Sequence, residues 1–301
     1  MRETVNKYRG NAATVSFLCD AVNLPVSTYM YRKRNGRPGR KPSEYSMKKD
    51  GAVVSNSEII ATIEKIADHP FADFGYIKMT HILKNQYGLI INPKKTYRLM
   101  KESGFLQQKQ MNRVARKRAE SWKISVSRPF EKLEIDIKYI HVHGENRNYY
   151  MLNLIDCYTW KLLSYRVSAS IRHTDVVEML QRVIALYGMP QDISLRSDNG
   201  SQFISKGVAE FIKNSGITHE FCHVATPQEN GYVECFHSIV QRFLKKRERF
   251  ESYFELKRVM KEWTAFYNDE RPHKGCGYKT PSDMMREYYE KNRENIGKIS
   301  A

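Results

Sequence analysis

Apolar and polar residues alternate in the segment LEIDIKYI with the two-residue period of a β-strand. Leu133 and Ile135 take one set of positions, and Glu134 and Asp136 take the other. Turn residues at 143–146 separate this segment from a second apolar run, so we expect a hairpin. Further along the chain, segments with this two-residue period alternate with segments that have the 3.6-residue period of a helix. The pattern predicts strands at 133–139, 149–156, 161–168, 193–198 and 217–222, and helices at 174–188, 205–215 and 229–248.

The N-terminal half has a helical pattern. Ile59, Ile63 and Ile66 recur with the spacing of one helix face, and residues 55–106 predict a compact unit of three short helices. Residues 11–34 predict two shorter helices around an Asn-Leu-Pro turn. The shorter pair is either a helix-turn-helix or two generic packed helices, and the three-helix unit suits either DNA docking or protein contact.

Positive charge is concentrated in this half. The chain has 50 Lys and Arg against 33 Asp and Glu, and residues 1–130 contain 25 of the former and 10 of the latter. Residues 131–301 are nearly balanced, with 25 against 23. The asymmetry favours a polyanionic partner for the N-terminal part, because Lys and Arg near phosphates release condensed counterions. Charge that merely keeps the protein in solution is the alternative.

These patterns predict an α/β protein with small all-helical DNA-binding domains in front of its core. Three strands followed by alternating helices and strands are typical of a ribonuclease-H-like layer, a mixed sheet with helices on both faces. We expect the following organisation: a helical segment with a basic linker at 1–54, a helical DNA-binding domain at 55–106, a second basic linker at 107–128, the core with C-terminal helices at 129–290, and a tail at 291–301.

Several classes of protein are disfavoured. The five cysteines form no C-x-x-C pair, which fits neither a disulfide framework nor a structural zinc site. No stretch approaches the ~18 consecutive apolar residues of a membrane span, and the N-terminus lacks a signal-peptide apolar region. We therefore expect a soluble intracellular protein. His141 and His143 resemble a metal pair but lack a third ligand, so we expect them to be solvent-exposed.

Three carboxylates are candidates for chemistry. Asp136 lies within the first predicted strand of the core, Asp198 ends the fourth, and Glu234 lies on the long helix after them. A carboxylate within a strand is costly unless it is solvated, paired or bound to a metal. Three acids at one edge of a sheet suit two divalent cations that clamp an in-line phosphoryl transfer, since Mg²⁺ prefers oxygen ligands.

The segments around these acids resemble a known family. Thirty-five residues separate Asp198 from Glu234, the D-D-35-E spacing of retroviral integrases and related bacterial transposases. The segments LEIDIKYI, LRSDNGSQF, TPQENGYVECFHS and WTAFYNDERPHKGCGYKTPSDMM are similar to the second-frame transposase of the IS-three insertion-sequence family. FADFGYIKMTHIL and NPKKTYRLMKESGF resemble the helical domain that precedes the core in that family.

The resemblance implies a Mg²⁺-dependent DNA transposase. Asp136, Asp198 and Glu234 would be both the catalytic and the metal-binding residues, with two Mg²⁺ ions that Mn²⁺ can replace. The reaction would be cleavage at the element's ends and strand transfer through a circular copied intermediate. The partners would be the terminal inverted repeats and target DNA, a second copy of the chain in a dimer on paired ends, and the first-frame product. The location would be the bacterial cytoplasm, at the nucleoid.

Other residues are candidates for DNA contact. They are Arg32, Lys33, Arg34, Lys94, Lys95, Arg98, Arg116, Lys117, Arg118, Asn230, His237, Arg242 and Lys245. Two positions depart from the family pattern. Gln241 stands where relatives often have Lys, so DNA contact there would pass to Arg242 or Lys245, and Trp160 stands where a basic residue is common. Neither departure touches the three acids.

Two other functions remain open on the sequence alone. One is a catalytically silent DNA-binding repressor of the element, against which the intact set of acids argues. The other is a structure-selective nuclease of the same fold. The segment YNDERPHKGCGYKTP and the two basic N-terminal units favour the transposase over the nuclease.

Overall fold

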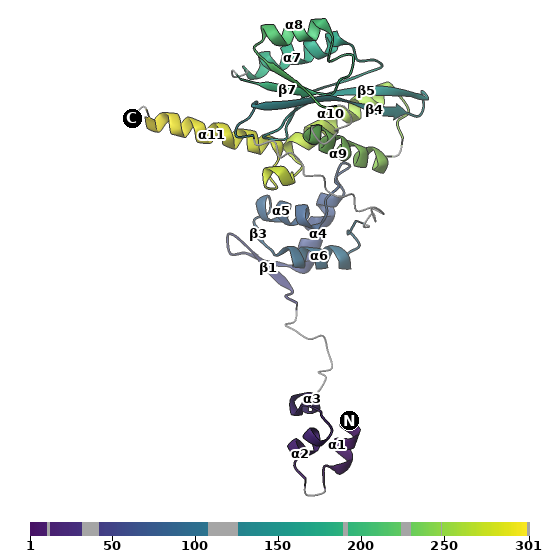
Figure 1. Cartoon of the computed structure of the whole chain (residues 1–301), viewed down its shortest axis with the longest axis vertical. Helices are drawn as coiled ribbons and strands as arrows, with labels where there is room; N and C mark the ends of the chain where they lie inside the picture. The colour runs from purple at the N-terminus through teal and green to yellow at the C-terminus, as the bar shows by residue number, and fades with distance from the viewer. Residues whose placement is uncertain are drawn as a thin grey trace. The chain divides into compact units, whose positions relative to one another are not determined.

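The computed structural model describes residues 1–10, 13–31, 42–107, 126–188, 192–223, 230–247 and 249–299. The chain divides into two compact units, Met1–Glu44 and Tyr45–Ala301. The smaller unit contains three short helices, α1 (Arg2–Tyr8), α2 (Val15–Ala21) and α3 (Val26–Met30) (Figure 1). The sequence predicted α2 and α3 but not α1. No helix among the described residues is long and apolar enough to cross a membrane.

The first part of the larger unit contains both helices and a small sheet. Strands β1 (Tyr45–Lys48), β2 (Val53–Ser55) and β3 (Leu89–Ile90) pair antiparallel in the order β2-β1-β3. Helices α4 (Asn56–Ala67), α5 (Tyr76–Asn85) and α6 (Pro93–Glu102) are the three that the sequence predicted. The expectation of an all-helical unit is therefore wrong. Residues 45–54, predicted as linker, form a hairpin that pairs with a third strand from a distant part of the sequence.

Local signals explain where these helices begin. Ser55 and Glu58 form a reciprocal capping box at the start of α4, and the side chain of Asn92 accepts the Lys94 amide at the start of α6. The inward faces then pack around Ile59 and Leu83, which are fully buried. The short strands carry little hydrophobic signal of their own, which is why only the helices were visible in the sequence.

The second part of the larger unit is built on a five-stranded mixed sheet. Its strands are β4 (Lys132–Val142), β5 (Arg147–Asp156), β6 (Leu162–Ser168), β7 (Ser194–Ser197) and β8 (Thr218–Phe221), in the order β6-β5-β4-β7-β8. β4 and β6 pair antiparallel with β5, whereas β7 pairs parallel with β4 and β8. This is the predicted ribonuclease-H-like α/β arrangement, with β4 at its centre.

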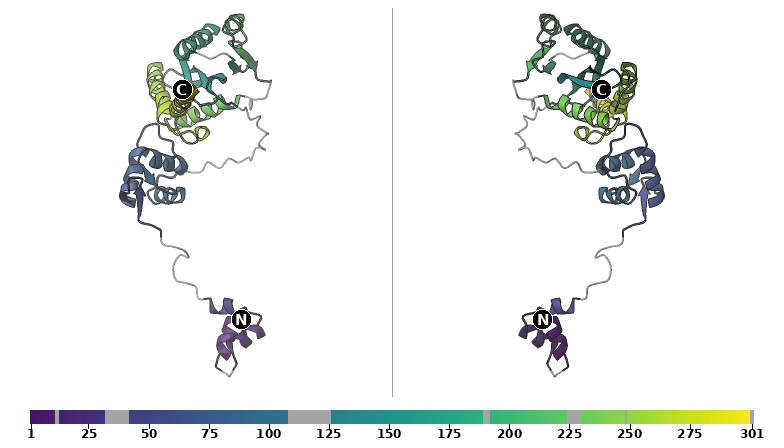
Figure 2. Two further views of the ribbon diagram at one scale, coloured as in Figure 1. Left: turned by 90° about the vertical axis from the view of Figure 1, so that its left-hand side faces the viewer. Right: turned by 90° about the vertical axis from the view of Figure 1, so that its right-hand side faces the viewer.

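Helices cover both faces of this sheet. Helices α7 (His173–Tyr187) and α8 (Lys206–Asn214) lie on one face, and α9 (Gly231–Arg247) and α10 (Tyr253–Asp269) lie on the other (Figures 1 and 2). A short 3-10 helix η2 (Lys274–Cys276) and α11 (Pro281–Ile299) follow. Leu133 and Ile135 join the core beneath α7 and α8, whereas Ile140 and Val142 join the core beneath α9 and α10. Both sets of alternating positions on β4 are therefore covered by helices.

Trp263 and Tyr267 on α10 are 2% and 1% exposed and belong to the core beneath α9. His141 and His143 are exposed at the end of the β4–β5 hairpin, as expected.

Cations from two strands surround the Glu220 carboxylate on β8. It accepts hydrogen bonds from Lys132 Nζ at 2.8 Å, from Arg196 Nη2 at 2.8 Å and from Ser194 Oγ at 2.5 Å. Burial by itself would raise the pKa of Glu220, but these hydrogen bonds outweigh it and lower the pKa to about 2. Because the unperturbed value is 4.5, the group stabilises the fold above that pH and loses its contribution as the pH falls towards 2.

We predict that Glu220→Gln lowers the melting temperature at pH 7 by about 2–4 °C, the change typical of losing ~1 kcal/mol in a domain of this size. The difference from the wild type should shrink as the pH falls from 5 to 2. Glu210→Gln, on the exposed surface of α8, is the control and should have no effect. A difference that stayed constant across this pH range would contradict the account.

Candidate active site

The first candidate acid lies beneath a helix rather than in solvent. Asp136 shares its face of β4 with Glu134 and Lys138, and the same face continues into Ile140, which packs under α9 and α10. In the register of the sheet, Asp136 lies opposite Asn153 on β5. Its Oδ1 accepts the backbone N–H of Ile137 at 2.7 Å. Several polar side chains of β4 therefore lie on the face of the sheet that α9 and α10 cover.

The second acid lies just past the end of β7. The Oδ1 of Asp198 accepts the Gly200 N–H at 2.9 Å, and the Asn199 side chain donates to the Cys222 carbonyl at 2.9 Å. These bonds hold the loop that follows β7. Asp136, Asp198 and Gln202 line one recess of about 310 Å³, together with residues just after β6.

The third acid lies in the first turn of α9. Glu234 is exposed, while Val233 and Phe236 beside it are buried completely and Val240 lies on the same apolar face. Glu234 thus lies on the solvent-facing side of α9, apart from the buried apolar face of the helix. A carboxylate in the first turn is favoured by the positive end of the helix dipole. Partial burial raises the pKa of Glu234.

The three acids lie within electrostatic range of one another. Burial, and then the charges of Asp198 and Glu234, raise the pKa of Asp136 to about 7, against the opposing effects of the Ile137 N–H and Lys138. Among the described residues, however, no three His, Cys, Asp or Glu side chains lie near enough together to hold a metal ion. The structure thus brings the three carboxylates to one place but spaces them more widely than a finished coordination sphere.

A buried histidine connects this group to β5. His237 is one turn after Glu234, and its side chain is 12% exposed. Its Nε2 lies 3.0 Å from Asn153 Nδ2, and its Nδ1 lies 3.6 Å from Asp136 Oδ2. Because an amide NH₂ only donates, Nε2 must accept, which leaves the proton on Nδ1, facing Asp136. His237 therefore faces Asp136 from α9, and its role in DNA contact stays a prediction.

The other candidates for DNA contact divide into four groups. Lys94 and Lys245 are exposed, on α6 and α9 respectively. Lys95 donates to the Tyr45 carbonyl, Arg98 pairs with Glu102, and Arg242 lies 3.5 Å from the Asp73 carboxylate. Asn230 is only 5% exposed. Arg32, Lys33, Arg34, Arg116, Lys117 and Arg118 lie outside the described residues.

The structure reveals a buried acid that the sequence analysis did not single out. Glu134 is fully buried, and its Oε2 accepts the N–H groups of Tyr232 and Val233 at 2.9 and 2.8 Å. Burial raises the pKa of Glu134 to about 7, although these two hydrogen bonds oppose the rise. The available signal was its position, two residues before Asp136 on the same face of a strand.

Asp156 is a different kind of buried acid. It is also fully buried, at the end of β5, where its carboxylate accepts the N–H groups of Phe130 and Thr159 and the Thr159 hydroxyl. All of these bonds are local to the turn and its neighbouring strand. We therefore regard Asp156 as a structural residue of the β5–β6 turn.

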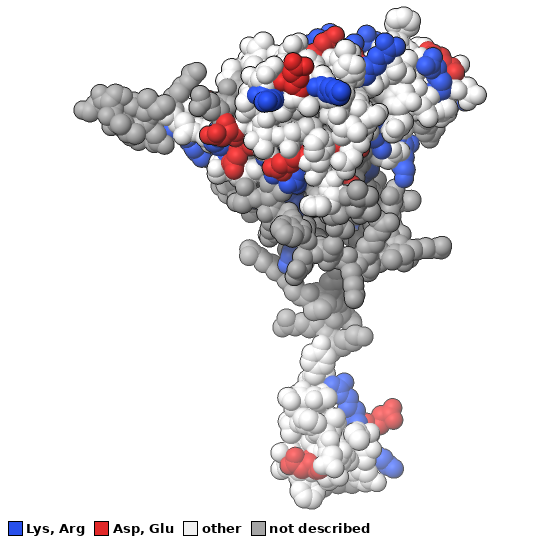
Figure 3. Space-filling view, turned by 45° about the horizontal axis from the view of Figure 1, so that its top comes forward, with Lys and Arg blue, Asp and Glu red and all other residues white. Residues whose placement is uncertain are grey.

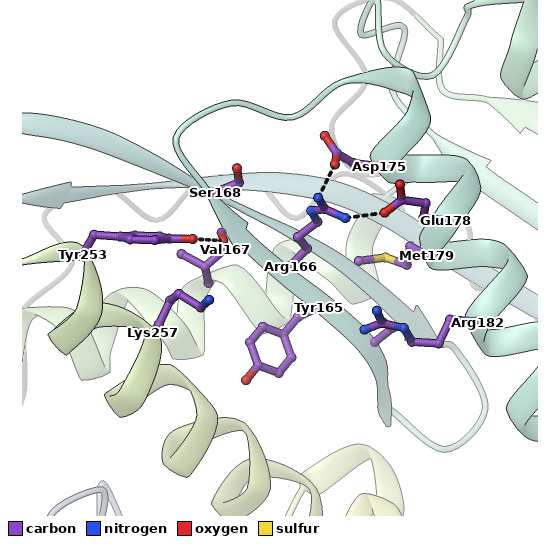
Figure 4. A pocket seen from close by; sticks show the side chains of 11 residues that line it. Tyr165, Arg166, Val167, Ser168, Asp175, Glu178, Met179, Arg182, Tyr253 and Lys257 are labelled. Atoms are coloured by element: carbon purple, nitrogen blue, oxygen red, sulfur yellow. Dashed lines mark hydrogen bonds and ion pairs between the residues drawn. The ribbon is translucent and has the colours of Figure 1, made fainter.

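A larger cavity, of about 440 Å³, lies between β6, α7 and the start of α10 (Figure 4). Arg166 in its wall is committed to two carboxylates, Asp175 at 2.8 Å and Glu178 at 2.6 Å. The Tyr253 hydroxyl donates to the Val167 carbonyl at 2.9 Å. None of the three candidate acids lines this cavity, so its chemistry is separate from theirs.

Comparison with known proteins agrees with this architecture. The family described as "Integrase core domain" matches residues 126–227, a second family with the same description matches residues 215–281, and the family described as "HTH-like domain" matches residues 55–116. The integrase-core matches begin just before β4 and continue into η2 and the start of α11. They include all three candidate acids.

Similar proteins come from insertion elements. An uncharacterized 39.2 kDa protein of insertion element IS476 from Xanthomonas euvesicatoria is 26% identical over 74% of this chain, and the chain spans 63% of that protein's length. The putative transposase InsK of insertion sequence element IS150 from Escherichia coli is 25% identical over 84% of this chain and 87% of its own length. The HTLV-2 integrase catalytic core domain, in a structure with magnesium, matches with 17% identity and a TM-score of 0.41, over 52% of this chain and 97% of that chain.

The mixed sheet and the matched domains define a protein with an integrase core behind an HTH-like domain. Within that class, the chain is similar to transposases and other proteins of insertion elements, which is consistent with the resemblance to the IS-three family.

The state of His237 can be tested directly. Burial, and to a lesser degree the charge of Lys138, lower the pKa of His237 to about 4 from an ordinary value of 6.5. Between pH 6.5 and 4 the His237 side chain is therefore protonated in the unfolded chain but neutral in the folded one. The free energy of unfolding should fall as the pH falls through this range. We predict a neutral imidazole protonated on Nδ1 at pH 7, measured by nitrogen-15 NMR of labelled histidine. A pKa at or above 6.5 would instead indicate an ion pair with Asp136.

Proposed function

We propose that this chain cleaves DNA at the ends of an insertion element and joins the freed 3′-hydroxyl to target DNA. The observation that carries the proposal is the gathering of Asp136, Asp198 and Glu234 from two neighbouring strands and a facing helix, close enough for two of them to raise the pKa of the third. Such mutual repulsion is relieved when a cation binds. Carboxylate oxygens are also the ligands that Mg²⁺ prefers.

The donor set therefore fits Mg²⁺, with Mn²⁺ as a substitute, and these three acids would hold it. When bound, a pair of such ions supplies Lewis acidity at the attacking and the leaving oxygen of an in-line transfer. The chain's own residues do the rest. His237 and the Ile137 N–H hold Asp136, the Gly200 N–H holds Asp198, and the first turn of α9 presents Glu234. Because the acids are spaced too widely as a set, we expect cation binding to draw them together.

DNA would follow α9 away from these acids. Gln241 and Lys245 continue the exposed face of the helix that begins with Glu234. Elsewhere, the visible face of the core carries interspersed Lys, Arg, Asp and Glu rather than one basic field (Figure 3). General affinity would then come mainly from the basic N-terminal half, and the core would contribute local contacts. Joining two element ends requires two active sites, so a homodimer on paired ends is the proposed assembly, with the first-frame product as a further partner.

One test of the proposed function concerns the acids themselves. Asp136→Asn, Asp198→Asn and Glu234→Gln should each reduce cleavage and strand transfer by more than about 100-fold while leaving DNA binding intact, because each removes a charge from the metal-binding set. The measurement is strand transfer of a labelled end fragment in Mg²⁺, beside a binding titration. Glu210→Gln is the control, since it removes an exposed carboxylate on the opposite face of the sheet. Near-normal transfer by any of the three variants would refute the assignment.

Another test of the proposed function concerns the path of the DNA along α9. Lys245→Ala should weaken binding to all sequences alike and reduce the salt slope by about 0.9, because a phosphate contact positions DNA without reading bases. Gln241→Lys should tighten binding by about 1 kcal/mol through a new charge-assisted hydrogen bond. Lys213→Ala, on α8, is the matched control. Unchanged affinity at two salt concentrations with a lowered melting temperature for Lys245→Ala would show that this face is packed against protein instead.

A further inference from the structure

Glu134 joins two elements that carry the proposed catalytic acids. It lies on β4 two residues before Asp136, on the same face of the strand. Its Oε2 accepts the N–H groups of Tyr232 and Val233, and Val233 immediately precedes Glu234. A single side chain therefore bridges the strand and the helix at points one and two residues away from the acids.

The bridge is energetically demanding. The first N–H groups of a helix have no partner within the helix, and a carboxylate there is favoured by the helix dipole. Glu134 is nevertheless fully buried, and its Oε1 has no hydrogen-bond partner among the described residues. Burying a carboxylate with one unpaired oxygen costs free energy. A Ser, Thr, Asp or Asn side chain at the N-cap position of the helix would satisfy its first N–H groups without that cost.

A second contact fixes the same turn. The ring of Tyr232 packs on Trp160 with centroids 4.4 Å apart, and Trp160 also packs on His273 at 4.4 Å. The indole of Trp160 lies close against the backbone of Gly275, where an added Cβ would come within 2.2 Å of the indole nitrogen. Glu134 thus binds the backbone N–H of Tyr232, and Trp160 packs against its ring. The departure at Trp160 from the family's basic residue has a packing role.

We propose that Glu134 is a positioning residue that sets the distance between the Asp136 strand and the Glu234 turn, and so the spacing of the metal-binding acids. This inference rests on the proposed function of those acids. Glu134 itself touches neither DNA nor metal. It acts through the two backbone N–H groups that it holds.

The experiment compares Glu134→Ala, Glu134→Gln and Glu220→Ala in the full-length chain. Glu220→Ala is the matched control, because it also removes a hydrogen-bonded carboxylate from the sheet, on the edge strand β8, where its hydrogen-bond partners lie on β4 and β7 rather than on α9. Three quantities are measured: hydrogen exchange of the peptide that contains residues 230–236, the rise in melting temperature caused by Mg²⁺ without DNA, and the kcat and KM of end cleavage.

We expect Glu134→Ala to speed exchange in the 230–236 peptide, to reduce the Mg²⁺-induced rise in melting temperature and to lower kcat by about 10–100-fold with KM unchanged. Glu134→Gln keeps an acceptor oxygen and should recover most of all three. Glu220→Ala should lower the melting temperature of the metal-free protein. It should leave the exchange at 230–236, the Mg²⁺-induced rise in melting temperature and the kinetic constants unchanged.

The proposal is overturned if Glu134→Ala and Glu220→Ala behave alike at matched stability, or if exchange at 230–236 is unchanged by Glu134→Ala. Failure of the proposed function would look different. The wild type itself would then show no Mg²⁺-dependent cleavage, while the exchange measurement would still show whether Glu134 holds the turn.

Discussion

The packing of α9 against the polar side of β4 is the constraint on which the site depends. A strand at the centre of a sheet that is covered on both faces normally carries apolar residues on both sides. β4 instead places Glu134 and Asp136 beneath a helix. Each must find a partner there, since an unpaired buried carboxylate is costly. Glu134 takes the helix backbone, and Asp136 is left facing His237, Asp198 and Glu234.

The cost of this arrangement has a functional meaning. Burial, and then the charges of Asp198 and Glu234, raise the pKa of Asp136. His237 cannot supply positive charge at neutral pH, because its burial lowers its own pKa to about 4. Under the proposed function, a hard divalent cation would supply positive charge to this all-oxygen donor set. Structural acids elsewhere differ: Glu220 is satisfied by Lys132 and Arg196, and Asp156 by its own turn.

Positive charge and the candidate acids lie in different parts of the chain. The excess of Lys and Arg lies before residue 131, while residues 131–301 are close to neutral. Among the basic residues that the structure describes in the N-terminal half, Lys95 donates to a backbone carbonyl and Arg98 pairs with Glu102. Under the proposed function, DNA would be held largely by the N-terminal segments, and the core would need no strong basic field around its candidate acids.

The sequence by itself predicted the strands and helices of the core and singled out Asp136, Asp198 and Glu234 as candidate acids. Period-two alternation and helical spacing are local properties of the chain, and the elements of the core followed from them. The sequence did not determine which face of β4 each helix covers, because alternation gives two faces without saying what packs on them. Only the tertiary structure decided that α9 lies over Glu134 and Asp136, that His237 points inward, and that β1 and β2 pair with the distant β3. These contacts join residues far apart in sequence, and no local pattern encodes such pairings.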